Sequence, residues 1–320
     1  MPPTTRIVMF GTGDFALPTF EGLLKTGHLV VGLVTQPDRP QGRKHQLIPS
    51  RIKVAAEAVG ISVFQPERVN EADALDVIRR FEPDLFVTAA YGQILSADLL
   101  TIPSGGGINL HGSLLPSYRG AAPVARAIQN GDATTGVTVI RMTPRVDAGG
   151  MLYRASTPID PDETADELEA RLARIGAPLI IQAVDRLAAG TAEFLPQAKG
   201  QVTKAPKLGK EDGRIDWSRP ARTVHDLVRS MQTWPGAFTT WHKDRAGGPV
   251  ERLIIHKSAL LEGTAEAPPG TVVEGLGDRF VVAADPGLVR LLIVQPVGRK
   301  PMPAADFLRG HPLLGERLGD

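Results

Sequence analysis

Cysteine is absent from this sequence of 320 residues. Its absence excludes disulfide bonds, thiolate metal ligands and a cysteine nucleophile. Net charge is almost absent as well, because 36 Lys and Arg residues are balanced by 35 Asp and Glu residues to give a formal charge of +1. That balance excludes a protein that holds nucleic acid by its overall charge, but it leaves room for local basic patches.

Long apolar runs are missing too. No segment approaches the ~18 apolar residues of a membrane span, so we expect no membrane association. The first residues lead directly into a strand-like run without the pattern of a signal peptide, which predicts a cytoplasmic location. No heptad repeat or broad apolar stripe demands assembly, so we expect a monomer.

The first half of the chain alternates between strand and helix patterns. Short apolar runs at residues 6–10, 29–34 and 84–89 have the character of buried parallel strands. Residues 72–81 carry apolar side chains at helical spacing. This alternation predicts an α/β fold class, with a parallel-type sheet covered by helices on both faces.

The second half of the chain has a different pattern. Apolar side chains follow one helical face over residues 162–187, and Pro178 leaves open whether this is one helix or two. Further on, one helix is followed by short strands with glycine turns, which is typical of a small barrel or sandwich. We predict an α/β domain over residues 1–189, a linker over 190–207 and a smaller β domain over 208–320.

Residues 11–16 fit the G-x-G-x-x-A pattern of dinucleotide-binding turns. Asp38 follows at about the distance where that fingerprint places its acidic residue, so a nicotinamide-dependent dehydrogenase is a rival hypothesis. Against it, Asp14, which we expect to cap the following helix, places a carboxylate where a bound phosphate would lie. A tight turn without any ligand is equally open.

Three polar residues form the main catalytic candidate. Asn109 and His111 are two residues apart at the end of a predicted strand, so both side chains can point into a crevice at the carboxyl edge of the sheet. Asp147 follows the strand predicted at residues 136–141, and it can reach and orient His111 if the two strands are neighbours. Asn109 and a protonated His111 would stabilise an oxyanion in acyl transfer. The alternatives are strand-end side chains bonded to local backbone and an ordinary turn at Asp147.

Several separated sequence blocks, in matching order, resemble the folate-dependent formyltransferases. The resemblance runs from residue 6 to about residue 235 and is weaker beyond. The blocks are RIVMFGTGDFA at 6–16, VTQPDRPQG at 34–42, YGQIL at 91–95, N-x-H followed by SLLP at 109–116, RGAAP at 119–123, GDATTGVT at 131–138, D-x-G at 147–149 and RIDW at 214–217.

The resemblance implies a reaction, a donor and an architecture. The expected reaction moves a formyl group from 10-formyltetrahydrofolate to the α-amino group of methionyl initiator tRNA, as in translation initiation. No metal and no NAD are expected. The implied fold is a Rossmann-like domain followed by an OB-like barrel that binds tRNA. The family's catalytic Asn, His and Asp correspond to Asn109, His111 and Asp147. Its folate-binding segments correspond to Tyr91, Gly92, Gln93, Ile94, Leu95, Ser113, Leu114, Leu115 and Pro116.

Local charge agrees with an RNA substrate. Residues 36–53 contain five basic residues and one acidic residue, and residues 199–222 contain seven and three, so each segment carries +4. Phosphate contacts from such segments would make binding salt-dependent, whereas a solvated basic surface is the alternative. In the family, the loop in the first segment enters the acceptor stem of the tRNA. We therefore expect tRNA binding by Arg39, Arg43, Lys44 and Lys207.

The sequence departs from the family pattern at three places. Gly13 replaces a usual Pro, residues 42–46 lack a usual second Gly after the Arg, and residues 147–150 read DAGG where DTGD is usual. Three other hypotheses also stay open. They are a relative that formylates a small amine such as a nucleotide sugar or glycinamide ribonucleotide, the dehydrogenase, and an RNA-binding protein with an inactive first domain.

Overall fold

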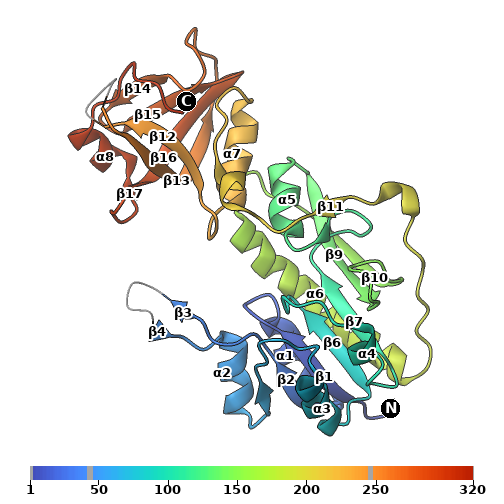
Figure 1. Ribbon diagram of the computed structural model, residues 1–320. Coiled ribbons are helices and arrows are strands. Elements are labelled where there is room, and N and C mark those ends of the chain that lie inside the picture. Colours follow the sequence, from blue (N-terminus) through green and yellow to red (C-terminus); the bar gives the residue numbers. More distant parts are fainter. Residues whose placement is uncertain (1–2, 42–45, 244–247, 320) are drawn as a thin grey trace. The chain divides into compact units, whose positions relative to one another are not determined.

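The protein is described by a computed structural model for residues 3–41, 46–243 and 248–319 (Figure 1). Its contacts divide the chain into two compact units. The first unit contains Met1–Pro123, Thr134–Thr157 and Glu169–Pro206, and the second contains Val124–Ala133, Pro158–Leu168 and Lys207–Asp320.

The first unit is built on a seven-stranded sheet in the order β10-β9-β7-β6-β1-β2-β5. Five neighbouring strands pair in parallel, and β9 is antiparallel to β7. The predicted α/β class with a parallel-type sheet is confirmed. The strands are β1 (Arg6–Gly11), β2 (Leu29–Val34), β5 (Val63–Phe64), β6 (Leu85–Ala89), β7 (Gly107–His111), β9 (Thr134–Arg141) and β10 (Met151–Pro158).

Helices α3 and α6 follow the apolar spacing predicted from the sequence, whereas α4 and α5 were not predicted. Pro178 lies inside α6, which is one helix of 24 residues. Buried side chains on both sides of the proline, such as Ala173 and Ile180, provide packing that offsets the lost backbone hydrogen bond. The helices are α1 (Leu17–Leu23), α2 (Arg51–Ala58), α3 (Ala72–Arg80), α4 (Ala97–Leu100), α5 (Pro123–Gln129) and α6 (Ala165–Ala188).

The turn after β1 differs from its predicted form. Asp14 does not cap α1, because the helix begins at Leu17 with Ala16 at the N-cap and no side-chain capping bond. Asp14 instead lies 3.4 Å from the Arg51 guanidinium. Gly13 has φ +72°, a conformation that proline cannot adopt. The backbone at this departure from the family pattern therefore follows a path that requires glycine.

The second unit contains a six-stranded antiparallel sheet in the order β12-β13-β16-β15-β14, with β17 paired to β16. This arrangement agrees with the predicted OB-like domain. The core includes Trp241, Phe280 and Phe307, each worth about 1.5–3 kcal/mol when fully buried. The elements are α7 (Ala221–Ser230), β12 (Ala237–His242), β13 (Val250–Leu261), β14 (Val272–Leu276), β15 (Arg279–Ala284), β16 (Gly287–Pro296), β17 (Met302–Pro303) and α8 (Ala304–Gly310).

Two short strand pairs lie outside these sheets. Strand β3 (Pro40–Gln41) pairs with β4 (Gln46–Leu47), and β8 (Arg119–Gly120) pairs in parallel with β11 (Lys204–Ala205). Strand β11 lies in the segment that the sequence predicts to be a linker, and this part of the linker is therefore attached to the first unit. Within the described ranges, no helix has both the length and the hydropathy of a membrane span.

Candidate active site

The carboxyl ends of β1, β2, β6 and β7 lie at one edge of the parallel sheet, where α/β proteins bind ligands. The loops at this edge are bonded to one another. The Thr12 hydroxyl donates to the Tyr91 carbonyl at 3.3 Å and accepts from the Gln36 N–H at 3.1 Å. The glycine-rich turn after β1 therefore supports the neighbouring loops through its Thr12 side chain.

Asp38, the acidic residue of the dinucleotide hypothesis, already has protein partners. Lys53 Nζ lies 2.6 Å from one carboxylate oxygen, and Gln65 Nε2 lies 2.9 Å from the other. Hydrogen bonds from Lys53 and then Gln65 hold the pKa of Asp38 below its usual value. Both oxygens are engaged, so Asp38 anchors the base of the β3–β4 loop and is not presented to a ribose.

Asn109 is half-buried on β7, between Thr88 of β6 and Ile140 of β9. Its side chain forms no hydrogen bond with any residue in the described part of the chain. The amide can therefore donate an N–H to a bound molecule without breaking an internal bond.

His111 ends β7 and is only 5% exposed. Its Nε2 lies 2.9 Å from the carbonyl oxygen of Tyr118, which can only accept, so Nε2 carries a proton. Its Nδ1 lies 3.6 Å from the Asp147 carboxylate. Both ring nitrogens therefore face acceptor oxygens. The gap to Asp147 is longer than a hydrogen bond, so Nδ1 is left able to interact with a reacting group.

Asp147 lies in the turn after β9, and β9 pairs with β7, which is the condition under which Asp147 can reach His111. Its carboxylate accepts the Gly120 N–H at 2.9 Å, and its backbone has φ +50°, which is uncommon for a residue other than glycine. The structure thus brings His111 and Asp147 together, with Asn109 two residues away from the histidine on the same strand.

Gly149 is required by a close backbone approach. A Cβ added there would lie 1.8 Å from the Arg141 carbonyl oxygen. We expect Gly149→Ala to displace the Asp147 turn and to lower the free energy of unfolding by about 1–3 kcal/mol, as measured by urea denaturation. Gly200→Ala is the matched control, because a Cβ there would meet nothing within 4 Å. Equal stability of the two variants would contradict this account.

The two predicted folate segments follow neighbouring parallel strands. Residues 91–95 follow β6 and residues 113–116 follow β7, so both loops begin at the edge that carries His111. Tyr91 and Leu95 are buried in the core, whereas Gly92 and Ile94 are exposed. In the second segment, Ser113 and Leu115 are fully buried, Pro116 is buried and Leu114 is half-buried.

Hydrogen bonds fix the shape of both segments. Gln93 accepts from the Val69 N–H at 3.0 Å and donates to the carbonyls of Pro66 and Glu67 at 3.3 Å. The Thr138 hydroxyl donates to the Ser113 carbonyl at 2.7 Å and accepts from the Leu115 N–H at 3.0 Å. Burial raises the pKa of the Tyr91 hydroxyl above its ordinary value.

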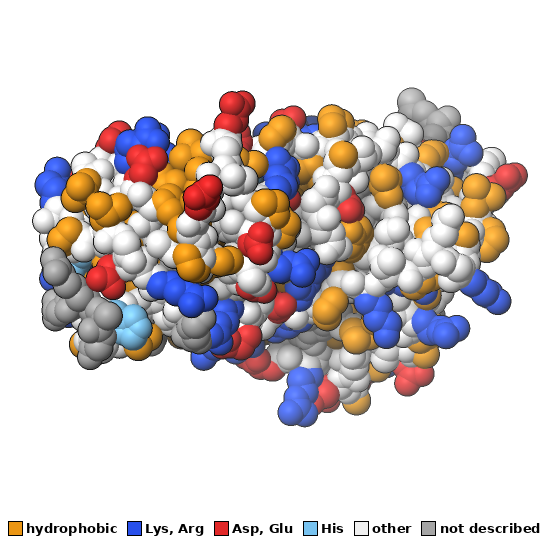
Figure 2. All heavy atoms as spheres, turned by 90° about the horizontal axis from the view of Figure 1, so that it is seen from above, with side chains coloured by type: hydrophobic (Ala, Val, Ile, Leu, Met, Phe, Trp, Pro, Cys, Tyr) orange, Lys and Arg blue, Asp and Glu red, His pale blue; other side chains and the backbone are white. Residues whose placement is uncertain are grey.

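The predicted tRNA-binding residues lie on exposed segments where the structure describes them. Arg39 is exposed and lies 3.3 Å from Glu67, and Lys207 is exposed. Arg43 and Lys44 lie outside the described residues. On the face shown in Figure 2, basic and acidic side chains are intermixed, as expected from the near-neutral total charge.

Sequence reasoning missed one side chain near the site. Gln197 lies in the predicted linker, yet it hydrogen-bonds to the backbone of the Asp147 turn. The surrounding residues have neither helical nor strand periodicity, so no pattern indicated this contact. Among the described residues, no group of three or more His, Asp and Glu side chains is placed to hold a metal ion.

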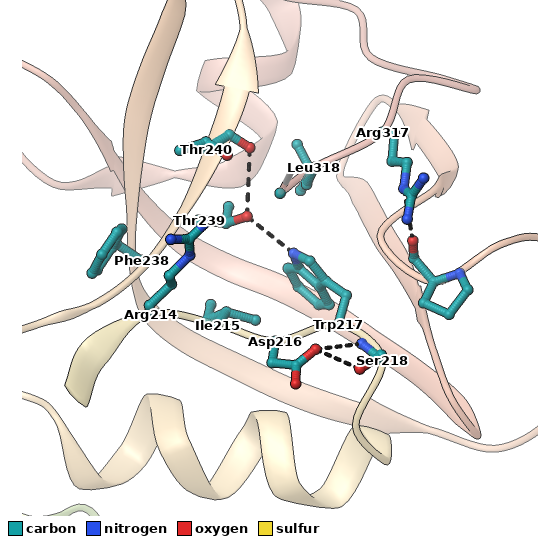
Figure 3. A pocket seen from close by; sticks show the side chains of 12 residues that line it. Arg214, Ile215, Asp216, Trp217, Ser218, Phe238, Thr239, Thr240, Arg317 and Leu318 are labelled. Carbon is teal, nitrogen blue, oxygen red and sulfur yellow. Dashed lines mark hydrogen bonds between the residues drawn. The ribbon is translucent and has the colours of Figure 1, made fainter. Parts of the chain in front are cut away.

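The second unit has a cavity of about 400 Å³ of its own (Figure 3). Trp217 is 4% exposed and donates its indole N–H to the Thr239 hydroxyl at 3.0 Å. None of the residues predicted for catalysis or folate binding lines this cavity. The lining consists of Arg214, Ile215, Asp216, Trp217, Ser218, Phe238, Thr239, Thr240, Pro269, Arg317, Leu318 and Gly319.

Comparison with known proteins finds two matched regions in the chain. Residues 5–184 match the formyl transferase family, and residues 207–312 match the formyl transferase C-terminal domain. A methionyl-tRNA formyltransferase of Moorella thermoacetica is 42% identical over 315 residues, which covers 98% of this chain and 99% of the relative. One of Solibacter usitatus is 43% identical over 316 residues, with the same coverage.

Similar solved structures support the fold. The sugar 3N-formyl transferase WlaRD has a TM-score of 0.66 at 16% identity, with 93% of this chain and 100% of that chain covered. HypX from Aquifex aeolicus in complex with tetrahydrofolic acid also has a TM-score of 0.66 at 16% identity. That match covers 96% of this chain, which spans 47% of HypX.

Proposed function

The chain belongs to the formyl transferase family, and we propose that it transfers the formyl group of 10-formyltetrahydrofolate to the α-amino group of methionyl initiator tRNA. The observation that carries this proposal is the similarity, along almost its whole length, to methionyl-tRNA formyltransferases at 42–43% identity. The product would be N-formylmethionyl-tRNA, which serves translation initiation.

The chemistry requires stabilisation of negative charge on oxygen. The methionyl amine attacks the formyl carbon, and the carbonyl oxygen becomes an oxyanion in the tetrahedral intermediate. The amide of Asn109, which has no hydrogen-bond partner among the described residues, would supply an N–H for this oxygen. Donors placed in advance need little reorganisation when the charge develops, which is why their removal affects the transition state most.

Proton transfer completes the reaction. A C–N bond forms to the methionyl nitrogen, the bond from the formyl carbon to folate N10 breaks, and the proton lost by the amine balances the one gained by N10. His111 is the group that would hold and donate a proton here, and the Asp147 carboxylate lies 3.6 Å from its Nδ1.

The residues at the sheet edge fit a folate co-substrate. Ile94 is 63% exposed and Leu114 is half-buried, so the loops after β6 and β7 both offer apolar surface to a flat ring. The proposed folate-binding residues are the nine predicted at 91–95 and 113–116. The formyl donor is consumed in the reaction, and the proposal includes neither a metal nor NAD.

We also propose which part of the chain carries catalysis and which part binds tRNA. Residues 1–189 would carry catalysis, residues 190–207 would connect, and residues 208–320 would bind tRNA. Arg39, Arg43, Lys44 and Lys207 are the proposed phosphate contacts. The enzyme would act in the cytoplasm and as a monomer. Size-exclusion chromatography with light scattering would test its oligomeric state.

Replacement of Arg43 tests the tRNA contacts. We expect Arg43→Ala to raise KM for methionyl-tRNA about tenfold, to leave KM for the folate unchanged and to reduce the salt slope of tRNA binding by about one. Arg79→Ala is the control, because Arg79 is an exposed arginine on α3 paired with Asp76. An equal rise in KM for both substrates in the Arg43 variant would contradict the assignment of this loop to tRNA binding.

A panel of acceptors tests the proposed function. The enzyme would be given 10-formyltetrahydrofolate with charged initiator tRNA, charged elongator tRNA, an amino-sugar nucleotide or glycinamide ribonucleotide. We expect efficient formylation of the initiator tRNA only. Formylation of a small amine in its place would show a relative with another acceptor, and binding of NAD without any response to folate would support the dehydrogenase.

A further inference from the structure

We infer that Gln197, from the segment between the two family-matched regions, is a positioning residue that holds the Asp147 turn against the strand carrying Arg119. The inference rests on the proposed function and adds a residue to its machinery. It is carried by the hydrogen bonds of a single side-chain amide.

The Gln197 amide uses its whole hydrogen-bonding capacity. Its Nε2 donates to the carbonyl oxygens of Asp147 and Gly149, both at 2.8 Å. Its Oε1 accepts from Nε and Nη2 of Arg119 at 3.0 and 2.7 Å. An amide has two donors and two acceptor lone pairs, so all four are engaged, and only Gln can present this set at this length.

The two segments that Gln197 joins lie on opposite sides of His111. Asp147 faces Nδ1 of the histidine, and the Tyr118 carbonyl, next to Arg119, accepts from Nε2. The following Gly120 N–H donates to the Asp147 carboxylate. The hydrogen bonds of Gln197 therefore help to set the distance between the Asp147 carboxylate and the Tyr118 carbonyl. This distance in turn affects the gap between His111 Nδ1 and the carboxylate.

The turn at Asp147 has an unfavourable backbone conformation that needs support from hydrogen bonds. Its φ of +50° is unfavourable for a residue with a Cβ, and it persists only where surrounding contacts enforce it. Two hydrogen bonds from Gln197 to the carbonyls at 147 and 149 provide that enforcement.

Gln197 is itself held from both sides along the chain. Two residues earlier, the Leu195 backbone exchanges hydrogen bonds with Met151 at 2.7 and 2.8 Å. Six residues later, the Thr203 hydroxyl and carbonyl accept from the N–H groups of Tyr118 and Arg119 at 2.8 and 2.9 Å. The segment that the sequence predicts to be a linker thus presents Gln197 in a fixed position.

A double-mutant cycle tests the inference. Gln197→Met keeps the length of the side chain and removes all four bonds. We expect kcat to fall about 10- to 100-fold, with KM for both substrates within about threefold, because misplacement of a catalytic group by about 1 Å can cost 10²-fold. In an Asp147→Asn background the same change should cost less than about threefold, because Gln197 acts through Asp147. Gln201→Met, an exposed position in the same segment, should leave kcat unchanged.

A readout without substrate separates this inference from the proposed function. The NMR titration of the His111 ring should shift in Gln197→Met relative to wild type and should not shift in Gln201→Met. Wild-type kcat in Gln197→Met, or an equal loss in the Asp147→Asn background, would overturn the inference. An unchanged His111 titration would also overturn it, even if the acceptor of the wild-type enzyme proved to be another amine.

Discussion

Asn109→Ala is expected to lower kcat for formyl transfer by about 10²–10³-fold, with little effect on KM for either substrate. The amide has no hydrogen-bond partner among the described residues, so its removal should change the stability of the free enzyme little. The loss should instead raise the free energy of the transition state in which the oxyanion forms. Single-turnover kinetics with enzyme in excess would measure the chemical step directly.

The Asn109→Asp variant distinguishes between two possible roles of residue 109, hydrogen-bond donation and packing. Aspartate has nearly the same size, but it replaces the N–H donor with a carboxylate that would repel the oxyanion. An oxyanion role predicts that Asp is no better than Ala. Recovery of activity in the Asp variant would show that residue 109 acts by packing alone.

His111→Ala is expected to lower kcat by about 10²–10⁴-fold, the usual contribution of a positioned acid or base. His28→Gln is a matched control within the first unit, because His28 is similarly buried and its Nε2 lies 3.0 Å from the Asp185 carboxylate. This control should lower stability while kcat per folded molecule stays within about twofold. A His111 variant with kcat close to the wild-type value would exclude the proposed proton transfer.

The sequence predicted the parts of the fold that depend on apolar runs. Strands β1 and β6 are contiguous apolar segments buried along almost their whole length, and their pattern admits no exposed face. Strand β10 was missed because its side chains alternate weakly between half-buried and exposed. Helix α8 was missed because seven residues are too few to establish a helical period.

The candidate site was predictable to different degrees. Asn109 and His111 share a face because of strand alternation, which is a local property. The approach of Asp147 depends on the antiparallel pairing of β9 with β7, and the sequence could state this only as a condition. The role of Gln197 could not be predicted from the sequence. Its partners lie about 50 and 78 residues away along the chain, and no periodic pattern of apolar residues marks these contacts.

The central claim is that this chain carries a formyl group from folate to a methionyl amine through the Asn109–His111–Asp147 cluster. Its most direct test uses 10-formyltetrahydrofolate labelled in the formyl carbon, charged initiator tRNA and either wild-type protein or Asn109→Ala. Mass spectrometry of the amino acid released from the tRNA should find labelled N-formylmethionine with the wild type, formed at least 10²-fold more slowly by the variant. Absence of labelled N-formylmethionine with the wild type, or equal rates for the two proteins, would contradict the account.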